Sequence, residues 1–327
     1  MNKFIYGFFI LCVIVLGVWF FLPQKSEYRR AESDSDENVV VKIGYRQHVF
    51  YAPLFVAIDR GFFSAYGVQV EPVAFESTNQ MVDALLSGRI DAALGGVNTF
   101  IIFNVAEKSP GSLKIFTVAQ ESRDNPLTFL LTRKESGIES ISDLEGRVVG
   151  SFLGSTVKAL YRKMVSENGI SRATLQQMSP RLELQALESG QVDAIIAIEP
   201  IAAIGAQKGI SIPIESALFD TYFLSDIPLA ASVVRGSFIN EYPEVVKRMV
   251  SATEDSIQFI HESPNETRNI IARYTPLSDE VSSEVRVPTF YMMSSEVVQK
   301  LNQLKQVLVE EGEIEGTVDV GDLVLEL

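Results

Sequence analysis

Two stretches of the chain share one pattern: LSGRIDAA at residues 86–93 and ESGQVDAI at residues 188–195. Each is typical of a helix end, a Ser-Gly turn, a β-branched residue, and Asp-Ala at the start of a buried strand. A pattern that recurs about one hundred residues later indicates an internal repeat. The sequence therefore predicts two similar α/β units.

The first unit extends outward from residues 86–93. The sequence predicts strands over 39–45, 68–75 and 90–94, and a helix that starts near Pro53 and is closed by Gly61. Ser77-Thr78-Asn79-Gln80 is a capping box that begins a second helix, and the glycines at 95 and 96 form a turn into a third. Strands and helices that alternate with short connections predict a mostly parallel sheet with helices on its faces.

The second unit repeats this order. We interpret Ser142-Asp143-Leu144-Glu145 as a capping box, 147–152 as a strand, and 157–168 as a helix closed by Gly169. In open parallel sheets, ligands bind beyond the carboxyl ends of the strands. A cleft between the two units is therefore expected to carry the ligand.

Composition excludes several functions. The chain has 327 residues, 46% of them hydrophobic, and a net charge of −14. This charge excludes a nucleic-acid binder that depends on neutralising phosphates. Its single cysteine, Cys12, can form no intrachain disulfide, and the two histidines, His48 and His261, are too far apart to form a local metal motif. We expect no metal site, cofactor or catalytic residue.

The amino-terminal segment is predicted to be a membrane anchor. Phe4 to Leu22 is an uncharged apolar run of 19 residues, long enough as a helix to span roughly 28 Å, about the thickness of a bilayer core. No small-residue cleavage site follows, so we expect an uncleaved anchor over residues 1–24, although a cleaved signal peptide is the alternative. The polar, acidic residues 25–38 are expected to form a linker.

The flanking charges favour the opposite orientation. Lys3 precedes the apolar run, whereas Lys25, Arg29 and Arg30 follow it, and by the positive-inside tendency this places the main body in the cytoplasm. We nevertheless expect the main body on the extracellular or periplasmic side of the membrane, because of the family that the rest of the chain resembles.

That resemblance is carried by eight short motifs in a fixed order: IGY (43–45), APLFVA (52–57), GFF (61–63), ALLSGRID (84–91), DLEGR (143–147), GST (154–156), GQVDA (190–194) and EP (199–200). Together they resemble the type II periplasmic substrate-binding proteins of ABC importers. The branch is the one that serves sulfonates, nitrate, taurine and thiamine-precursor pyrimidines. The match begins at about Val39 and covers most of the remaining chain.

The resemblance implies an α/β fold with two lobes and a ligand cleft between them. Lobe I would comprise residues 39–123 plus 228–327, and lobe II residues 124–227. It also implies a monomer that delivers a small ligand to an ABC permease and its ATPase. The family often has an aromatic residue before Glu-Pro, whereas this chain has Ile198, and its only tryptophan, Trp19, lies in the apolar run. This departure leaves the ligand open, as a sulfonate- or nitrate-like anion or a pyrimidine-like heteroaromatic.

Polar and aromatic residues of the predicted cleft loops are candidates for ligand binding. Ser155 and Thr156 open a helix with Lys158 in its first turn, a combination that suits an anion. The other candidates supply hydrogen bonds, aromatic faces or close backbone approach: Gln47, His48, Phe50, Tyr51, Ser77, Thr78, Gly96, Asn98, Gln120 and Glu199.

Structural roles are the alternatives for the same residues. Ser77, Ser155 and Thr156 could be plain helix caps, with Lys158 in solvent, and Phe50 and Tyr51 could pack the lobe. A turn-to-strand role is favoured for Asp91 and Asp193 over acid/base chemistry.

Two other functions remain open for the chain. It could be an enzyme on the same fold, such as a thiamine-pyrimidine synthase or a menaquinone-pathway lyase, although the synthase depends on a cysteine-rich segment and several histidines that this chain lacks. It could also be the ligand-sensing part of a regulator, although no helix-turn-helix-like segment precedes the domain.

Overall fold

The computed structural model describes residues 39–326, and all of them lie within one compact unit. The predicted anchor, residues 1–24, and the predicted linker, residues 25–38, lie outside the described residues. Within residues 39–326, no helix combines the length and apolar character that crossing a bilayer requires.

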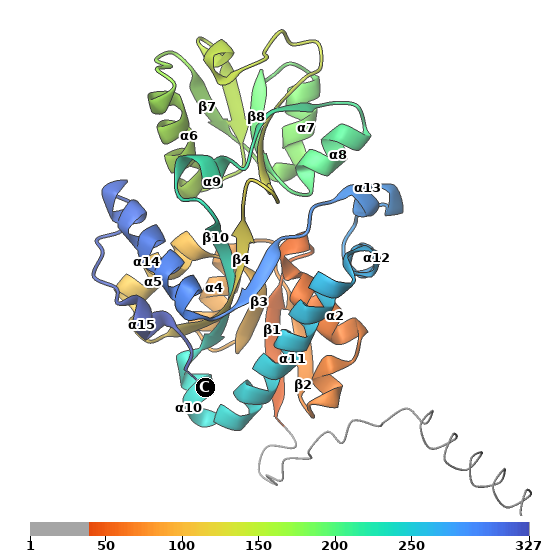
Figure 1. The fold of residues 1–327 in the computed structure, drawn as a ribbon, viewed down its shortest axis with the longest axis vertical. Helices are drawn as coiled ribbons and strands as arrows, with labels where there is room; N and C mark the ends of the chain where they lie inside the picture. Colours follow the sequence, from red (N-terminus) through yellow and green to blue (C-terminus); the bar gives the residue numbers. More distant parts are fainter. Residues whose placement is uncertain (1–38, 327) are drawn as a thin grey trace, which may run out of the picture. The chain divides into compact units, whose positions relative to one another are not determined.

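The described chain forms two sheets (Figure 1). The first has six strands in the order β11-β4-β10-β3-β1-β2, and the second has five in the order β7-β6-β8-β5-β9. We call the six-stranded sheet with its helices lobe I, and the five-stranded sheet with its helices lobe II. The expected two-sheet α/β architecture is therefore observed, whereas the residue boundaries of the lobes stay a prediction.

Lobe I is built from both ends of the described chain. Its strands are β1 (Val40–Tyr45), β2 (Gln69–Ala74), β3 (Ala92–Asn98), β4 (Leu113–Glu121), β10 (Ile227–Arg235) and β11 (Thr289–Met292). Its helices are η1 (Val49–Tyr51), α2 (Ala52–Asp59), α3 (Phe62–Ala65), α4 (Thr78–Leu86), α5 (Thr99–Lys108), α10 (Gly236–Glu241), α11 (Pro243–Glu262), α12 (Pro264–Tyr274), α13 (Asp279–Glu284), α14 (Ser295–Glu310) and α15 (Val320–Leu323).

Lobe II comes from the middle of the chain. Its strands are β5 (Thr128–Thr132), β6 (Val148–Ser151), β7 (Thr174–Gln177), β8 (Ala194–Ile198) and β9 (Ile212–Ser216). Its helices are η2 (Ile141–Leu144), α6 (Ser155–Glu167), α7 (Pro180–Glu188), α8 (Ile201–Gln207) and α9 (Leu218–Tyr222).

Helices cover both faces of each sheet, as the buried strands require. In β1, Val41 and Ile43 point into a cluster with Leu54 of α2 and Met249 of α11. In lobe II, Phe129 and Leu131 of β5 pack with α7, and the intervening Leu130 belongs to the cluster that includes α6. Because successive strand residues face opposite sides, both faces need apolar residues.

The internal repeat is visible in the strand pairing. β3 pairs parallel with β1 and antiparallel with β10, and β8 pairs parallel with β6 and antiparallel with β5. The repeated aspartates also match. Asp91 accepts a hydrogen bond from the N–H of Lys42 at 3.0 Å, and Asp193 accepts one from the N–H of Val148 at 2.9 Å. These contacts support the structural role that we favoured for both residues.

Two local predictions were wrong. Gly95 and Gly96 belong to β3 rather than to a turn, because β10 pairs alongside and extends the strand to Asn98. The capping box predicted at Ser142 lies two residues earlier, at Ser140 with Asp143, and it begins the short helix η2. Asp143 accepts from the N–H of Ser140 at 2.9 Å, a role that we had assigned to Glu145.

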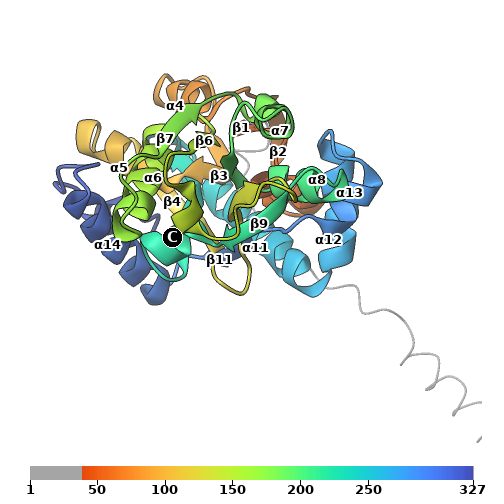
Figure 2. The same cartoon turned by 90° about the horizontal axis from the view of Figure 1, so that it is seen from above.

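Two connections join the lobes, one after β4 and one before β10 (Figure 1). A third contact comes from the carboxy-terminal segment, where α13 packs against α8, and the two helices lie side by side in Figures 1 and 2. The carboxyl ends of β1 and β3, and of β6 and β8, lead into the loops that carry most of the candidate ligand residues.

Candidate ligand site between the lobes

A pocket of about 570 Å³ is lined by both lobes. Lobe II contributes Ser155 and Thr156 at the start of α6, and lobe I contributes α4, α5 and the residues after α14. The lining residues are Asn79, Val82, Asp83, Leu86, Phe100, Ile101, Asn104, Val105, Lys108, Ser109, Ser155, Thr156, Gly312 and Glu313. The pocket therefore places the predicted helix start of lobe II opposite one face of α4 and one face of α5, along the length of both helices.

The start of α6 is open. Gly154 occupies the N-cap position, so no side chain caps the helix, and neither Ser155 nor Thr156 takes the capping role that we considered. Gln177 fixes the preceding loop by donating to the carbonyls of Phe152 and Gly154, at 2.9 and 3.0 Å. Free N–H groups at a helix start favour an anion. Lys158 is exposed and does not line the pocket. Its position corresponds to the alternative in which Lys158 points into solvent.

The corresponding helices of lobe I are capped by their own side chains. Ser77 accepts from the N–H of Gln80 at 3.3 Å, and Asn98 accepts from the N–H of Ile101 at 3.3 Å. Ser77, Thr78 and Asn98 thus lie next to lining residues of the pocket without lining it themselves. Ser77 Oγ and Asn98 Oδ1 already accept backbone N–H groups of their own helices.

A second group of candidates gathers where the loop after β1 meets the end of β8. His48 is half-buried, and its surroundings, mainly burial and then Arg46, lower the pKa of its imidazole to about 3. The imidazole also forms a hydrogen bond with the backbone of Glu199 in lobe II. His48 is therefore a neutral group that contacts both lobes.

Glu199 is completely buried at this contact. One carboxylate oxygen accepts from the N–H of Ala203 at 3.2 Å, and the other lies 3.4 Å from Nη1 of Arg286. Burial raises the pKa of Glu199, and the hydrogen bond and Arg286 oppose this effect. The carboxylate satisfies the first turn of α8 and an ion pair, so a role in ligand binding would need it to exchange partners.

The aromatic candidates pack the interior of lobe I. Phe50 and Tyr51 are buried, and the hydroxyl of Tyr51 donates to the carbonyl of Gly96 at 3.1 Å. A Cβ atom at position 96 would lie 2.3 Å from the tyrosine ring, so only glycine fits there. These contacts correspond to the packing alternative for Phe50 and Tyr51.

Two candidates lie apart from the others. Gln47 is exposed. Gln120 lines a different pocket of about 210 Å³, together with Asp226, Tyr291 and Lys300. The structure therefore brings together Ser155, Thr156 and the neighbours of Ser77 and Asn98, but not Gln120.

Sequence reasoning missed several polar residues of the pocket. Asn79 and Asp83 are one helical turn apart on α4, and Asn104 and Lys108 are one turn apart on α5. This spacing of four residues could have identified a polar face on each helix. Within residues 39–326, no group of three or more His, Cys, Asp or Glu side chains could hold a metal ion.

Comparison with known proteins places the chain in one family. A family model described as "NMT1/THI5 like" matches residues 49–267, which is more than half of the chain. A Brucella abortus protein that carries the provisional name of a binding protein is 23% identical over 272 residues, which cover 82% of this chain and 81% of the relative.

Solved structures share the fold. The aliphatic sulphonate-binding protein SsuA of Escherichia coli superimposes with a TM-score of 0.71 at 16% identity, over 88% of this chain and 92% of that chain. The desulfurization enzyme DszB superimposes with a TM-score of 0.67 at 15% identity, over 87% of this chain and 96% of that chain. The same fold thus serves both a binding protein and an enzyme.

Proposed function

The chain belongs to the NMT1/THI5-like family, and from this premise we propose that it is the solute-binding component of an ABC importer. It would capture a small ligand between its lobes and deliver it to a permease and its ATPase. The single observation that carries the proposal is the pocket lined by both lobes, with the uncapped start of α6 on one side and α4 and α5 on the other.

The α6 start supports an anionic ligand of the sulfonate or nitrate class. Its N–H groups are not used by a side-chain cap, and the hydroxyls of Ser155 and Thr156 lie beside them. The sulphonate-binding protein shares the fold. A pyrimidine-like heteroaromatic is the alternative, and the neutral His48 beside Glu199 supports it, because uncharged hydrogen-bonding groups suit an uncharged ring.

An enzyme is the second candidate function, and the shared fold of the desulfurization enzyme supports it. A ligand-sensing role in a regulator is a further alternative, with no specific observation in its favour. The proposed location is the extracellular or periplasmic side of the membrane, where importer binding proteins act. Tethering through residues 1–24 stays a prediction.

Native mass spectrometry of the chain purified without denaturation tests the function. We expect a non-covalent adduct that is lost on unfolding and that returns, chemically unchanged, when the released molecule is added back. A molecule converted to a product on re-addition would favour the enzyme. Failure to hold any adduct after incubation with sulfonates, nitrate, taurine and aminopyrimidines would contradict the proposal.

A further inference from the structure

Glu121 occupies the junction between the two connections that join the lobes. It is the last residue of β4, where the chain leaves lobe I, and its side chain is completely buried. Its backbone is paired with Ile227, the first residue of β10, where the chain returns to lobe I. Both crossing segments therefore meet at this residue.

The two carboxylate oxygens of Glu121 hold different parts of lobe II. Oε1 accepts from the N–H groups of Leu127 and Thr128, at 2.8 and 2.6 Å, where the first connection enters β5. Oε2 accepts from the N–H groups of Phe219 and Asp220, at 3.1 and 3.3 Å, in α9, just before the second connection. Each oxygen thus binds the lobe II end of one connection.

The hydroxyl of Thr128 links these two halves. It lies 2.7 Å from Oε1 and 2.9 Å from Oε2 of Glu121, and it accepts from the N–H of Leu218 at 3.0 Å. All these partners belong to lobe II, whereas Glu121 belongs to lobe I. A rotation of one lobe against the other would therefore change the hydrogen bonds of this carboxylate.

An aromatic contact connects the same junction to the pocket. The ring of Phe219 lies 5.9 Å from the ring of Phe100, and Phe223 lies 5.6 Å from Phe100. Phe100 belongs to α5 and lines the pocket between the lobes. A ligand that shifts α5 or Phe100 would therefore also act on the backbone that Glu121 holds.

Four buried N–H groups surround this side chain, so an apolar residue in its place would leave them without an acceptor. Burying a charged carboxylate is nevertheless costly. An acceptor with two oxygens can, however, hold two segments at a fixed separation. We propose that Glu121 is the pivot of lobe movement, a positioning residue that sets the angle between the lobes. This inference depends on the proposed function for its use in ligand capture.

Protonation of the Glu121 carboxylate should change how firmly the lobes are held, and this change can be measured. Burial raises the pKa of Glu121 to about 7, against the hydrogen bonds from Thr128, Leu127 and Asp220. A proton on one oxygen turns an acceptor into a donor that faces N–H groups, so the protonated form holds one connection less well. Near neutral pH, both forms are populated.

Several other ionisable groups lie on the elements around the pivot. The hydroxyl of Tyr222 on α9 donates to the carboxylate of Glu215 on β9 at 3.1 Å, and burial raises the pKa of Glu215. Asp220 of α9 is 3.4 Å from Arg123 on the first connection, and its carboxylate accepts from the N–H of Asp226 at 2.7 Å. Tyr291 is on β11, which pairs with β4, and burial raises its pKa above the usual value. A tyrosine with a raised pKa does not titrate near pH 7.

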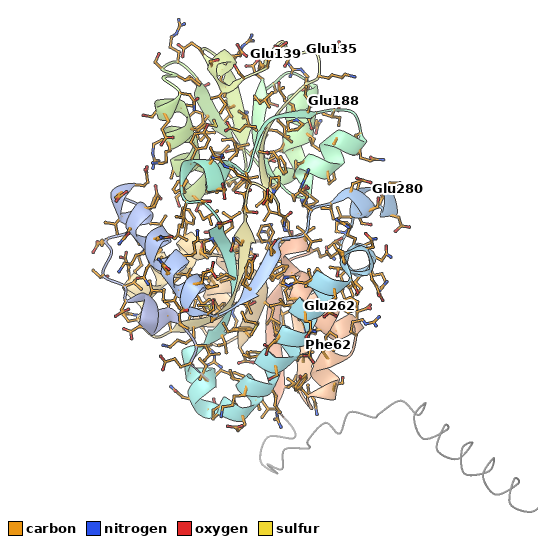
Figure 3. All side chains as sticks on the ribbon, in the orientation of Figure 1. Phe62, Glu135, Glu139, Glu188, Glu262 and Glu280 are labelled. Atoms are coloured by element: carbon orange, nitrogen blue, oxygen red, sulfur yellow. The ribbon has the colours of Figure 1, made fainter. Side chains whose placement is uncertain are left out.

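Interlobe distances in the full chain test the proposal. Spin labels are attached at Glu188→Cys on α7 and Glu262→Cys on α11, both exposed and on different lobes (Figure 3), in a Cys12→Ser background. Pulsed electron spin resonance then gives the distance distribution without ligand. We expect the distribution to broaden as the pH falls from about 8.5 to about 5.5. In Glu121→Gln, it should be broad at both values.

The matched control is Glu107→Gln. Glu107 also accepts three backbone N–H groups, from Glu315, Gly316 and Thr317, but all within lobe I. Its variant should keep the wild-type distribution and its pH dependence. Amide exchange at Thr128 and Phe219 should become at least about tenfold faster in Glu121→Gln and unchanged in Glu107→Gln.

The proposal is overturned if Glu121→Gln keeps the wild-type distribution and its pH response. If that variant does not fold, the wild-type pH series decides alone, because a distribution that does not change between the two pH values also overturns the proposal. Thr128→Val, which removes only the bridging hydroxyl, should give an intermediate broadening. No ligand enters these measurements, so failure to find a ligand would contradict the proposed function and leave the pivot result standing.

Discussion

Glu183 on α7 is a buried carboxyl in an apolar position. The repeat aligns it with Met81 of α4, which is fully buried in lobe I. Within the described part of the chain, neither oxygen of Glu183 has a hydrogen-bond partner, and burial raises its pKa to about 8. An unpartnered carboxyl should destabilise the fold once it ionises.

Replacing this residue by its counterpart, Glu183→Met, should therefore stabilise the protein in a pH-dependent way. Below about pH 4.5, both the folded and the unfolded states hold the proton, so ionisation costs nothing. Between that value and about pH 8, the unfolded state has lost the proton and the folded state keeps it, so the stability of the wild type falls as the pH rises. The gain from Met should grow over the same range, to a few kcal/mol.

Urea unfolding of wild type and Glu183→Met at about pH 5 and about pH 9 measures this difference. Glu188→Met, on the exposed end of the same helix, is the control and should show no such pH dependence. An equal effect of Glu183→Met at both pH values would show that Glu183 has a partner in solution.

The α6 start gives a second prediction for single residues. Once mass spectrometry has identified an anionic ligand, Ser155→Ala or Thr156→Val should weaken its binding by about tenfold, since a hydrogen bond to a charged group is worth roughly 1.5–3 kcal/mol. Lys158→Gln is the control, because Lys158 is exposed and outside the pocket. Titration calorimetry measures all three. Wild-type affinity in the Ser155 and Thr156 variants would move the site toward His48.

At the scale of elements, the segment after α13 forms a contact between the lobes in addition to the two connections. Arg286 lies 3.4 Å from the buried carboxylate of Glu199, and its guanidinium is 5.3 Å from the centre of the Phe129 ring of β5. α13, just before it, packs against α8. The segment that contains α13 and Arg286 thus contacts lobe II at the start of α8.

Arg286→Ala should destabilise the protein, because it leaves the Glu199 carboxylate buried without its cation. In a double-mutant cycle with Glu199→Gln, we expect a coupling free energy of at least about 1 kcal/mol. The exposed pair Arg60 and Glu266, at 2.7 Å, is the control and should couple by less. Equal coupling in the two pairs would mean that burial adds nothing to the Arg286 contact.

On the scale of the whole molecule, ligand should close the lobes. Only two covalent connections join the two sheets within the described residues. Ion pairs also link the lobes: Lys163 with Glu311 at 2.7 Å and Arg162 with Glu313 at 2.8 Å. The exposed pair Arg181 and Glu76, at 3.4 Å, also crosses between the lobes. Most other contacts lie within a lobe, which favours hinge motion.

The ligand identified by mass spectrometry should therefore raise the melting temperature by mass action and reduce the radius of gyration. Calorimetry and small-angle X-ray scattering, with and without ligand, measure these two effects. An unrelated anion of equal charge is the control. A higher melting temperature with an unchanged radius would support binding and contradict closure.

The sequence alone determined the two α/β units and much of their local structure. Ser-Gly turns, a Pro at the start of α2 and the Ser77 cap act through neighbouring residues, so their effects can be recognised along the chain. The paired motifs around Asp91 and Asp193 also form the same contact in each lobe. The order of strands and helices then placed the α6 start at a cleft edge.

Only the tertiary structure decided what the cleft residues do. Phe50 lies against Gly95 and Tyr51 against Gly96, both on the distant strand β3, and Gln120 lines another pocket. The partners of Glu121 are up to 99 positions away in the chain, and Glu199 meets Arg286 across 87. Local patterns carry no information on such pairings, because they depend on how two independently formed sheets pack and join.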